Sequence, residues 1–443
     1  MNTPIYDFLM RYSNSNMLRC HMPGHKGKAQ ANCIPDELFQ MDITEVCGAD
    51  SLFEANGIIA ESERNMARLY KTAATVYSAG GSTLCIQTML AIMKQENRRV
   101  FAIRNVHRAF LNAAALLGIE VEWILPEYSG SILSGEININ SIDSALKKSN
   151  KPSCLYITSP DYTGKMADIA ALSEICHKYG AVLLVDNAHG AHLAFFEKSI
   201  HPIALGADLC CDSAHKMLPA LTGAALLHTS SENYAKQLKS SMSIFASTSP
   251  SYPIMASLDT CTTYINKQIR NDICKNITYI NSFKSFFENR LIFADGEPFH
   301  ITVKAAESGF CGNELAQILR KNGVECEYSD NELLILLMSP ANNSADYRRL
   351  TEAMKIAIES AHEYSSASEC FSMTLPEKSM SIRDAVFSPS EEIDIDDSLD
   401  RVCAAVKVPC PPAIPIVASG EIINAECINI FKKYGISQIN VVK

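Results

Sequence analysis

The sequence places a lysine between two apolar segments, where an amine could do covalent chemistry. Lys216 follows the strand-like run Leu209–Cys211 and precedes a second run, Ala224–Leu227. A buried ammonium is costly unless it is paired or loses its proton, and a desolvated lysine can form a Schiff base with an aldehyde. The alternative is a surface lysine at the tip of a loop, and this segment alone does not separate the two.

Two further features concern a phosphate group. The run Gly80-Gly81-Ser82-Thr83 opens a predicted helix, and small residues at a helix N-terminus let free N–H groups and the positive end of the helix dipole meet an anion. Ser213 and His215 flank Lys216 and could donate hydrogen bonds to the same phosphate. The alternative for Ser82 and Thr83 is ordinary N-cap chemistry.

Two more candidates could contact a flat cationic ring. Asp186 ends the apolar run Val182–Val185 and could pair with a ring nitrogen, or it could simply cap a helix. His107 follows the strand-like run Val100–Ile103 and could stack on the ring, or it could be an ordinary polar histidine. His189 and His192 have the spacing of a metal pair, but no third ligand is evident, and we predict no metal site.

The elements that must position these residues alternate along residues 61–250. Continuous apolar strands interleaved with helices are typical of an α/β protein whose mostly parallel sheet is covered on both faces. The predicted strands are Ala74–Tyr77, Val100–Ile103, Val121–Ile124, Cys154–Ile157, Val182–Val185 and Leu209–Cys211, and the predicted helices include Glu61–Leu69, Leu84–Lys94, Ala109–Leu117 and Ile169–Lys178. Ligands bind at the carboxyl ends of the strands in such sheets, where the candidate residues fall.

We predict four segments along the chain. Residues 1–60 are expected to form an irregular arm, 61–265 the large α/β domain, 266–365 a smaller α+β domain and 366–443 a C-terminal segment. A long interrupted helix over Met255–Asn289 links the second segment to the third. The smaller domain is expected to contain the strands His300–Lys304 and Leu333–Met338 and the helices Gly312–Asn322 and Ala345–His362.

Composition limits the class of partner and the compartment. The 443 residues are 47% hydrophobic and carry a formal net charge of −10, so a nucleic-acid partner has no electrostatic support. None of the 16 cysteines forms a C-x-x-C pair, which favours reduced thiols and a cytoplasmic protein. The N-terminus lacks a signal-peptide pattern, and the apolar window Ala73–Met93 is too interrupted to span a membrane.

Taken together, a phosphate cradle, a stacking imidazole, a carboxylate and a lysine are the parts that hold pyridoxal phosphate. Their order resembles fold-type I pyridoxal-phosphate enzymes, and several motifs resemble the Orn/Lys/Arg decarboxylase family in its compact form. These motifs are His21–Gly27, Asp42–Glu45 with Asp50–Leu52, Ser213–Thr222, and Pro409–Pro415 with Gly420-Glu421. The chain departs from the family pattern at Asn187 (commonly Glu), Gly223 (Gln), Cys410 (Tyr) and Ala413 (Gly).

The resemblance implies a role for each candidate. Lys216 would bond the cofactor's aldehyde and Asp186 would hold the ring nitrogen's proton. His107 and Ala188 would cover the two ring faces, and His189 would lie near the ring hydroxyl. The phosphate would be bound by Ser82, Thr83, Ser213 and His215.

The implied reaction is decarboxylation of lysine, ornithine or arginine, with Glu421, Asp50 or Glu45 as candidates for reading the substrate's distal cation. Alternatives left open are another reaction of the same cofactor, such as transamination or aldol cleavage, and a non-catalytic relative. The resemblance also implies a homodimer, in which Ser247–Pro250 of one subunit could reach the other's cofactor phosphate.

Overall fold

The computed structural model describes residues 1–28, 35–128, 130–365, 373–405 and 414–443. Contacts divide the chain into two compact units. The first comprises Met1–Glu96 and Val182–Asp272, and the second comprises Asn97–Ala181 and Ile273–Lys443. Each unit is therefore built from two separate stretches of sequence. The four segments predicted above are divisions along the chain, and they stay a prediction.

Seven strands make up the large sheet. The first unit supplies, in spatial order, β1 (Ala74–Ser78), β9 (Ala225–Thr229), β8 (Leu209–Asp212) and β7 (Val182–Asp186). Within it β7 and β8 are parallel, and only β9 runs against its neighbours. The second unit supplies β6 (Ser153–Thr158), β2 (Arg99–Ile103) and β3 (Val121–Ile124), all parallel. The predicted mostly parallel α/β sheet is confirmed.

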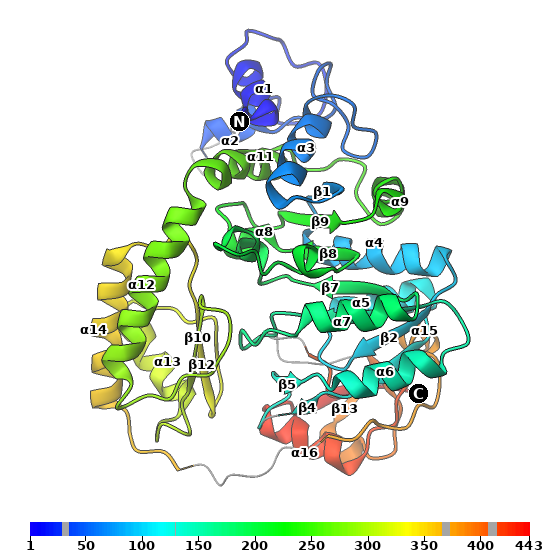
Figure 1. Cartoon of the computed structure of the whole chain (residues 1–443), viewed down its shortest axis with the longest axis vertical. Helices are drawn as coiled ribbons and strands as arrows, with labels where there is room; N and C mark the ends of the chain where they lie inside the picture. The colour runs from blue at the N-terminus through cyan, green and yellow to red at the C-terminus, as the bar shows by residue number, and fades with distance from the viewer. Residues whose placement is uncertain (29–34, 129, 366–372, 406–413) are drawn as a thin grey trace. The chain divides into compact units, whose positions relative to one another are not determined.

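Helices of the first unit pack on its strands (Figure 1). Helix α4 (Gly81–Gln95) contacts β1, β8 and β9, while α3 (Ile58–Tyr70) and α11 (Tyr252–Lys267) contact β1. Helix α4 begins three residues earlier than predicted, so the Gly-Ser-Thr run is its first turn. The remaining helices include α8 (Ala214–Met217), α9 (Glu232–Ala235), α10 (Leu238–Ser243), η1 (Ala191–Phe195) and η2 (Pro202–Leu205). No helix of the described residues is long and apolar enough to cross a membrane.

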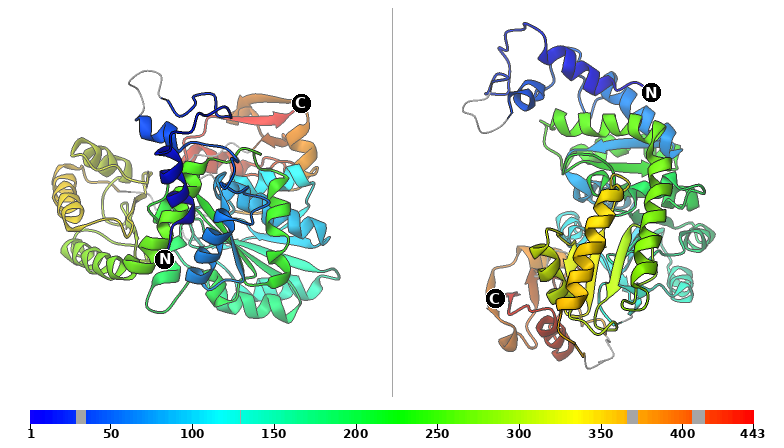
Figure 2. Two further views of the ribbon diagram at one scale, coloured as in Figure 1. Left: turned by 90° about the horizontal axis from the view of Figure 1, so that it is seen from above. Right: turned by 90° about the vertical axis from the view of Figure 1, so that its left-hand side faces the viewer.

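The N-terminal residues are more regular than predicted. Two helices form there, α1 (Pro4–Ser13) and α2 (Asp36–Met41), so the prediction of an irregular arm over 1–60 is wrong for these stretches. Helix α1 has proline in its first turn and buries Ile5 and Leu9, which lie one turn apart on one face. Both views in Figure 2 show α1, in dark blue, beside the green helix α11 that it contacts.

The second unit contains helices α5 (Arg108–Leu117), α6 (Ile139–Lys148) and α7 (Ile169–Lys178), and a short hairpin of β4 (Glu127–Tyr128) and β5 (Gly135–Glu136). The linking helix of the prediction is two helices, α11 and α12 (Ile269–Phe287), which meet at Gln268. A three-stranded sheet of order β10-β12-β11 follows, with α13 (Gly312–Lys321) beside it and α14 (Ser344–Ser360) against α13. Its strands are β10 (His300–Lys304), β11 (Tyr328–Ser329) and β12 (Leu333–Leu337).

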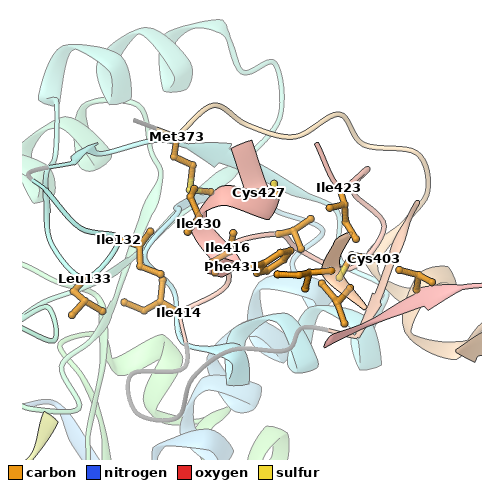
Figure 3. Packing of buried hydrophobic residues seen from close by; sticks show 14 of the residues in the cluster. Ile132, Leu133, Met373, Cys403, Ile414, Ile416, Ile423, Cys427, Ile430 and Phe431 are labelled. Carbon is orange, nitrogen blue, oxygen red and sulfur yellow. The ribbon is translucent and has the colours of Figure 1, made fainter. Parts of the chain in front are cut away.

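The C-terminal residues form a second small sheet within this unit. Strands β13 (Ser390–Asp394), β15 (Gln438–Val442) and β14 (Cys403–Ala405) pair in that order, with α15 (Ile382–Phe387), η3 (Ile395–Asp397) and α16 (Ala425–Lys433) around them. Figure 3 shows the apolar cluster that anchors this part, in which Ile414, Ile416 and Phe431 pack with Ile132 and Leu133. The C-terminal segment is thus fixed by burial against residues almost 300 positions earlier.

Candidate active site

Two parallel strands of the first unit bring the predicted lysine and carboxylate to one edge of the sheet. Strand β7 is buried throughout and ends at Asp186, whose Cα pairs with that of Cys211 on β8. Strand β8 ends at Asp212 and leads into the short helix α8, which carries Lys216. Both functional groups therefore follow the carboxyl ends of neighbouring strands, as predicted.

Lys216 is half-buried, and its amine has a defined partner. The Nζ atom lies 2.9 Å from Nε2 of His189, a residue that is 6% exposed. The resemblance implied a place for His189 near a ring hydroxyl, and its contact with Lys216 was not predicted. The imidazole can accept a proton from the amine or return one, which suits a lysine that must change its protonation state.

Asp186 is held in place by two donors. Its Oδ1 atom accepts a hydrogen bond from the backbone N–H of Ala188 at 3.2 Å and one from the thiol of Cys211 at 3.6 Å. The side chain is 2% exposed. The predicted alternative of a simple helix cap receives no support from these contacts, because a turn and not a helix follows Asp186.

The residues predicted to bind a phosphate lie in the same unit, and their role stays a prediction. The Oγ atoms of Ser213 and Ser82 lie 2.9 Å apart, which joins the start of α4 to the end of β8. Helix α4 has no side-chain cap, and a Cβ added at Gly81 would meet no atom within 4 Å, so its N-terminus is open. His215 donates from Nδ1 to the carbonyl of Ala224 at 2.9 Å, and Thr83 is exposed.

His107 belongs to the second unit. It is the N-cap of α5, where its Nδ1 atom accepts a hydrogen bond from the N–H of Ala109 at 3.1 Å. The ring is half-exposed and its orientation is fixed by this bond. A histidine thus caps the N-terminus of α5, a position where Ser, Thr, Asp or Asn is more usual. The stacking role implied by the resemblance stays a prediction.

A buried hydrogen-bond network was missed from the sequence. Asp212 is fully buried and accepts from Nδ2 of Asn187 at 2.7 Å and from Nε2 of both His201 and His228 at 3.1 Å. Burial alone raises the pKa of this carboxyl, but the two histidines outweigh it and hold the pKa below its ordinary value. The network ties the residue after Asp186 to the end of β8.

His201, Cys210 and Asp212 lie close enough to suggest a metal site, since their ligand atoms are all within 4.8 Å of one another. The protonation states argue against it. Nδ1 of His201 accepts from the N–H of Ile203 at 3.3 Å, so Nε2 carries the ring proton and donates to Asp212. Burial, aided by the Asp212 charge, raises the pKa of the Cys210 thiol well above its ordinary value, which disfavours the thiolate that a metal requires.

Two of the three carboxylates suggested for substrate recognition already have partners. Glu421 forms a buried bidentate pair with Arg104, at 2.9 and 2.5 Å. Asp50 accepts backbone N–H groups at the start of α3, including those of Gly57 at 2.8 Å and Ile59 at 3.0 Å. Glu45 is exposed. Glu421 and Asp50 are therefore engaged in holding the fold.

Two of the four departures from the family pattern lie among the described residues, and each has a local structural explanation. Gly223 has φ +93°, a left-handed conformation that favours glycine, and its carbonyl accepts the N–H of Gly81 at 2.8 Å. Asn187 supplies the amide that binds Asp212. Cys410 and Ala413, with most of the proline-rich motif, lie outside the described residues.

Comparison with solved structures gives the class of fold. A lysine decarboxylase of Francisella novicida has a TM-score of 0.82 at 16% identity, with 100% of this chain and 81% of that chain covered. A serine palmitoyltransferase with pyridoxal phosphate has a TM-score of 0.53 at 12% identity, with 67% and 75% covered. The predicted fold-type I architecture is confirmed.

Sequence comparison then gives the family. Residues 3–306 match the model of the Orn/Lys/Arg decarboxylase major domain, and residues 364–434 match that of the family's C-terminal domain. An arginine decarboxylase of Bacillus subtilis is 26% identical, with 97% of this chain and 93% of the relative covered. The chain belongs to the Orn/Lys/Arg decarboxylase family, which confirms the predicted amino-acid decarboxylase class.

Proposed function

We propose that this protein uses pyridoxal phosphate to decarboxylate lysine, ornithine or arginine, releasing CO₂ and the corresponding amine. The observation that carries the proposal is the pairing of Lys216 with His189 beside the strand that ends at Asp186. A lysine whose amine is held by an imidazole, next to a fixed carboxylate, is suited to this cofactor. The family membership of the chain limits the reaction to amino-acid decarboxylation.

The residues of the first unit fit the cofactor. The open N-terminus of α4 and the hydroxyls of Ser82 and Ser213 offer hydrogen-bond donors to a phosphate. Asp186 offers a buried carboxylate that a protonated ring nitrogen can satisfy, and Lys216 offers the amine for the aldehyde. When bound, pyridoxal phosphate supplies an electron sink for the pair of electrons left by the departing carboxylate.

Each side chain then has one task. Asp186 holds a proton on the ring nitrogen, and the bonds from Ala188 and Cys211 fix its position. His189 holds or moves a proton at Nζ of Lys216. His215 donates from Nδ1 to the carbonyl of Ala224, and we assign its Nε2 atom to the phosphate, as the family resemblance implies. We assign His107 to the ring face, as the family resemblance implies.

The setting proposed for this activity is a cytoplasmic homodimer that serves polyamine metabolism. The cysteines that the structure describes are free thiols, which suits a reducing compartment. The homodimer follows from the resemblance to fold-type I enzymes. Size-exclusion chromatography with light scattering tests the oligomeric state separately from activity.

The deciding experiment supplies cofactor-loaded protein with lysine, ornithine and arginine in turn, and measures CO₂ and the amine formed. We expect one substrate to give cadaverine, putrescine or agmatine in equal amount to the CO₂. Lys216→Ala should abolish this activity and the visible absorbance of covalently held cofactor. Lys198→Ala, which alters an exposed lysine of the same unit, is the matched control and should change neither.

Two results would contradict the proposal. The first is a Lys216→Ala protein that still shows the absorbance of covalently held cofactor. The second is a wild-type protein with that absorbance that releases no CO₂ from any of the three amino acids.

A further inference from the structure

A cavity of about 210 Å³ lies within the second unit, where β2 and β6 end. Asn105 follows β2 by two residues and Thr158 is the last residue of β6, and both line the cavity. Because a water molecule takes about 30 Å³ of liquid, the cavity has room for a small organic molecule. None of the roles assigned above uses this cavity.

Two polar atoms in the lining are buried without a hydrogen-bond partner. They are Oδ1 of Asn105, whose residue is 6% exposed, and Oγ1 of Thr158. A buried polar atom without a partner costs free energy, and native proteins rarely retain one unless a ligand or water completes it. The amide oxygen can only accept a hydrogen bond, so what completes it must be a donor.

The charges around the cavity favour a cation. The lining contains the carboxylates of Glu136, Asp161 and Asp168, against the single ammonium of Lys165. Lys165 is paired with Glu136 at 3.1 Å, which leaves Asp161 and Asp168 without a compensating charge in the lining. Asp161 is 4% exposed and accepts from the backbone and hydroxyl of Thr163, so it is fixed in place.

The rest of the lining suits a short hydrocarbon chain. Ile139, Met166 and Leu172 contribute apolar surface to the same cavity. A bare metal ion would make no use of this surface, and it requires several oxygen ligands at short distance. An anion would be repelled by the excess of carboxylates and would leave the Oδ1 acceptor of Asn105 without a donor.

We propose that this cavity is a binding site for a small organic cation, an alkylammonium or guanidinium, that donates hydrogen bonds to Asn105 and Thr158. The proposal goes beyond the decarboxylation proposed above and does not rest on it. Its ligand class follows from the cavity's own acceptors, charge and apolar wall.

The test is a calorimetric titration of the cofactor-loaded protein with agmatine and with cadaverine as probes. Asn105→Leu should weaken binding of at least one probe about tenfold or more, because it removes an acceptor for a charged donor. Asn105→Asp, which keeps the shape and adds a negative charge, should tighten binding of the same probe. Thr158→Val should weaken it, and Thr278→Val, on the exposed surface of α12, is the matched control and should not.

A crystal structure of the wild-type protein with the tighter probe gives a readout that does not depend on the folding of variants. We expect the cationic group within hydrogen-bond distance of Oδ1 of Asn105. The proposal is overturned if the cavity holds only water at saturating probe, or if Asn105→Leu and Asn105→Asp bind both probes as the wild type does. Neither result depends on turnover, so a failure here is distinct from a failure of the proposed activity.

Discussion

Replacing Glu421 by glutamine should destabilise the second unit strongly. Glu421 is 4% exposed and Arg104 is fully buried, and two hydrogen bonds join them. Glutamine keeps one acceptor for the guanidinium but leaves its charge uncompensated. Breaking a buried pair in this way costs about 3–5 kcal/mol, a large share of the 5–15 kcal/mol that typically separates folded from unfolded domains.

The chain provides its own probe for this measurement. Trp123 is the single tryptophan, and the Arg104 guanidinium carbon lies 4.6 Å from the centre of its ring. Urea unfolding followed by tryptophan fluorescence therefore reports on the unit that contains the pair. We expect the midpoint to fall and the free energy of unfolding to drop by about 3–5 kcal/mol.

Glu391→Gln is the control, because it breaks an exposed pair with Arg401 in the same unit. Exposed pairs contribute about 0–1 kcal/mol, so this variant should unfold nearly as the wild type does. Replacing both Arg104 and Glu421 by apolar residues should recover much of the loss. Equal stability of Glu421→Gln and Glu391→Gln would refute the reasoning.

Two further predictions concern the first unit. A Cβ at Gly190 would lie 1.9 Å from Oδ1 of Asn187, so Gly190→Ala should displace Asn187 from Asp212 and lower thermal stability by about 1–3 kcal/mol, whereas Gly24→Ala, with no atom within 4 Å, should not. Unchanged melting of Gly190→Ala would contradict this. Burial raises the pKa of Asp259 from 3.8 to about 6, so the folded protein favours the neutral carboxyl. The resulting contribution to the free energy of unfolding, up to about 3 kcal/mol, is fully present below pH 3.8 and is lost as the pH rises through about 6. Urea unfolding of the wild type relative to Asp259→Asn should therefore favour the wild type more at pH 4.5 than at pH 8, and an equal difference at both would refute it.

Local patterns in the sequence predicted the strands of the large sheet well. Most of these strands are continuous apolar runs, because they are buried along almost their whole length. Val182–Val185 and Leu209–Cys211 each extend by one acidic residue in the structure, and these acids are the candidate site residue Asp186 and the network's Asp212. Asp186 could be predicted as a candidate because it is an acid directly after a wholly apolar strand-like run. The network of Asp212 could not be predicted, because its partners His201 and His228 are known only once the strands are paired.

Contacts between residues far apart in the chain could not be predicted from the sequence. Arg104 and Glu421 are 317 positions apart, and no local pattern distinguishes a carboxylate that binds substrate from one that neutralises an arginine. The helix α1 could have been found, since Pro4, Ile5 and Leu9 form a recognisable amphipathic start. The turn residues of His21–Gly27 favoured an irregular structure for the whole region instead.

The division of the first unit has a consequence for biosynthesis. Its two stretches are separated in the chain by residues 97–181, and the second stretch ends at Asp272. When the ribosome has made Glu96, the strand β1 exists without its partner β9, and the helix α4 exists without the strands β8 and β9 that it contacts. At about 5–20 residues per second, completing the unit takes roughly another 9–35 s. The nascent N-terminal portion must avoid aggregation for that time. The helix α4 favours aggregation, because the apolar side chains that it buries in the folded protein still lack partners.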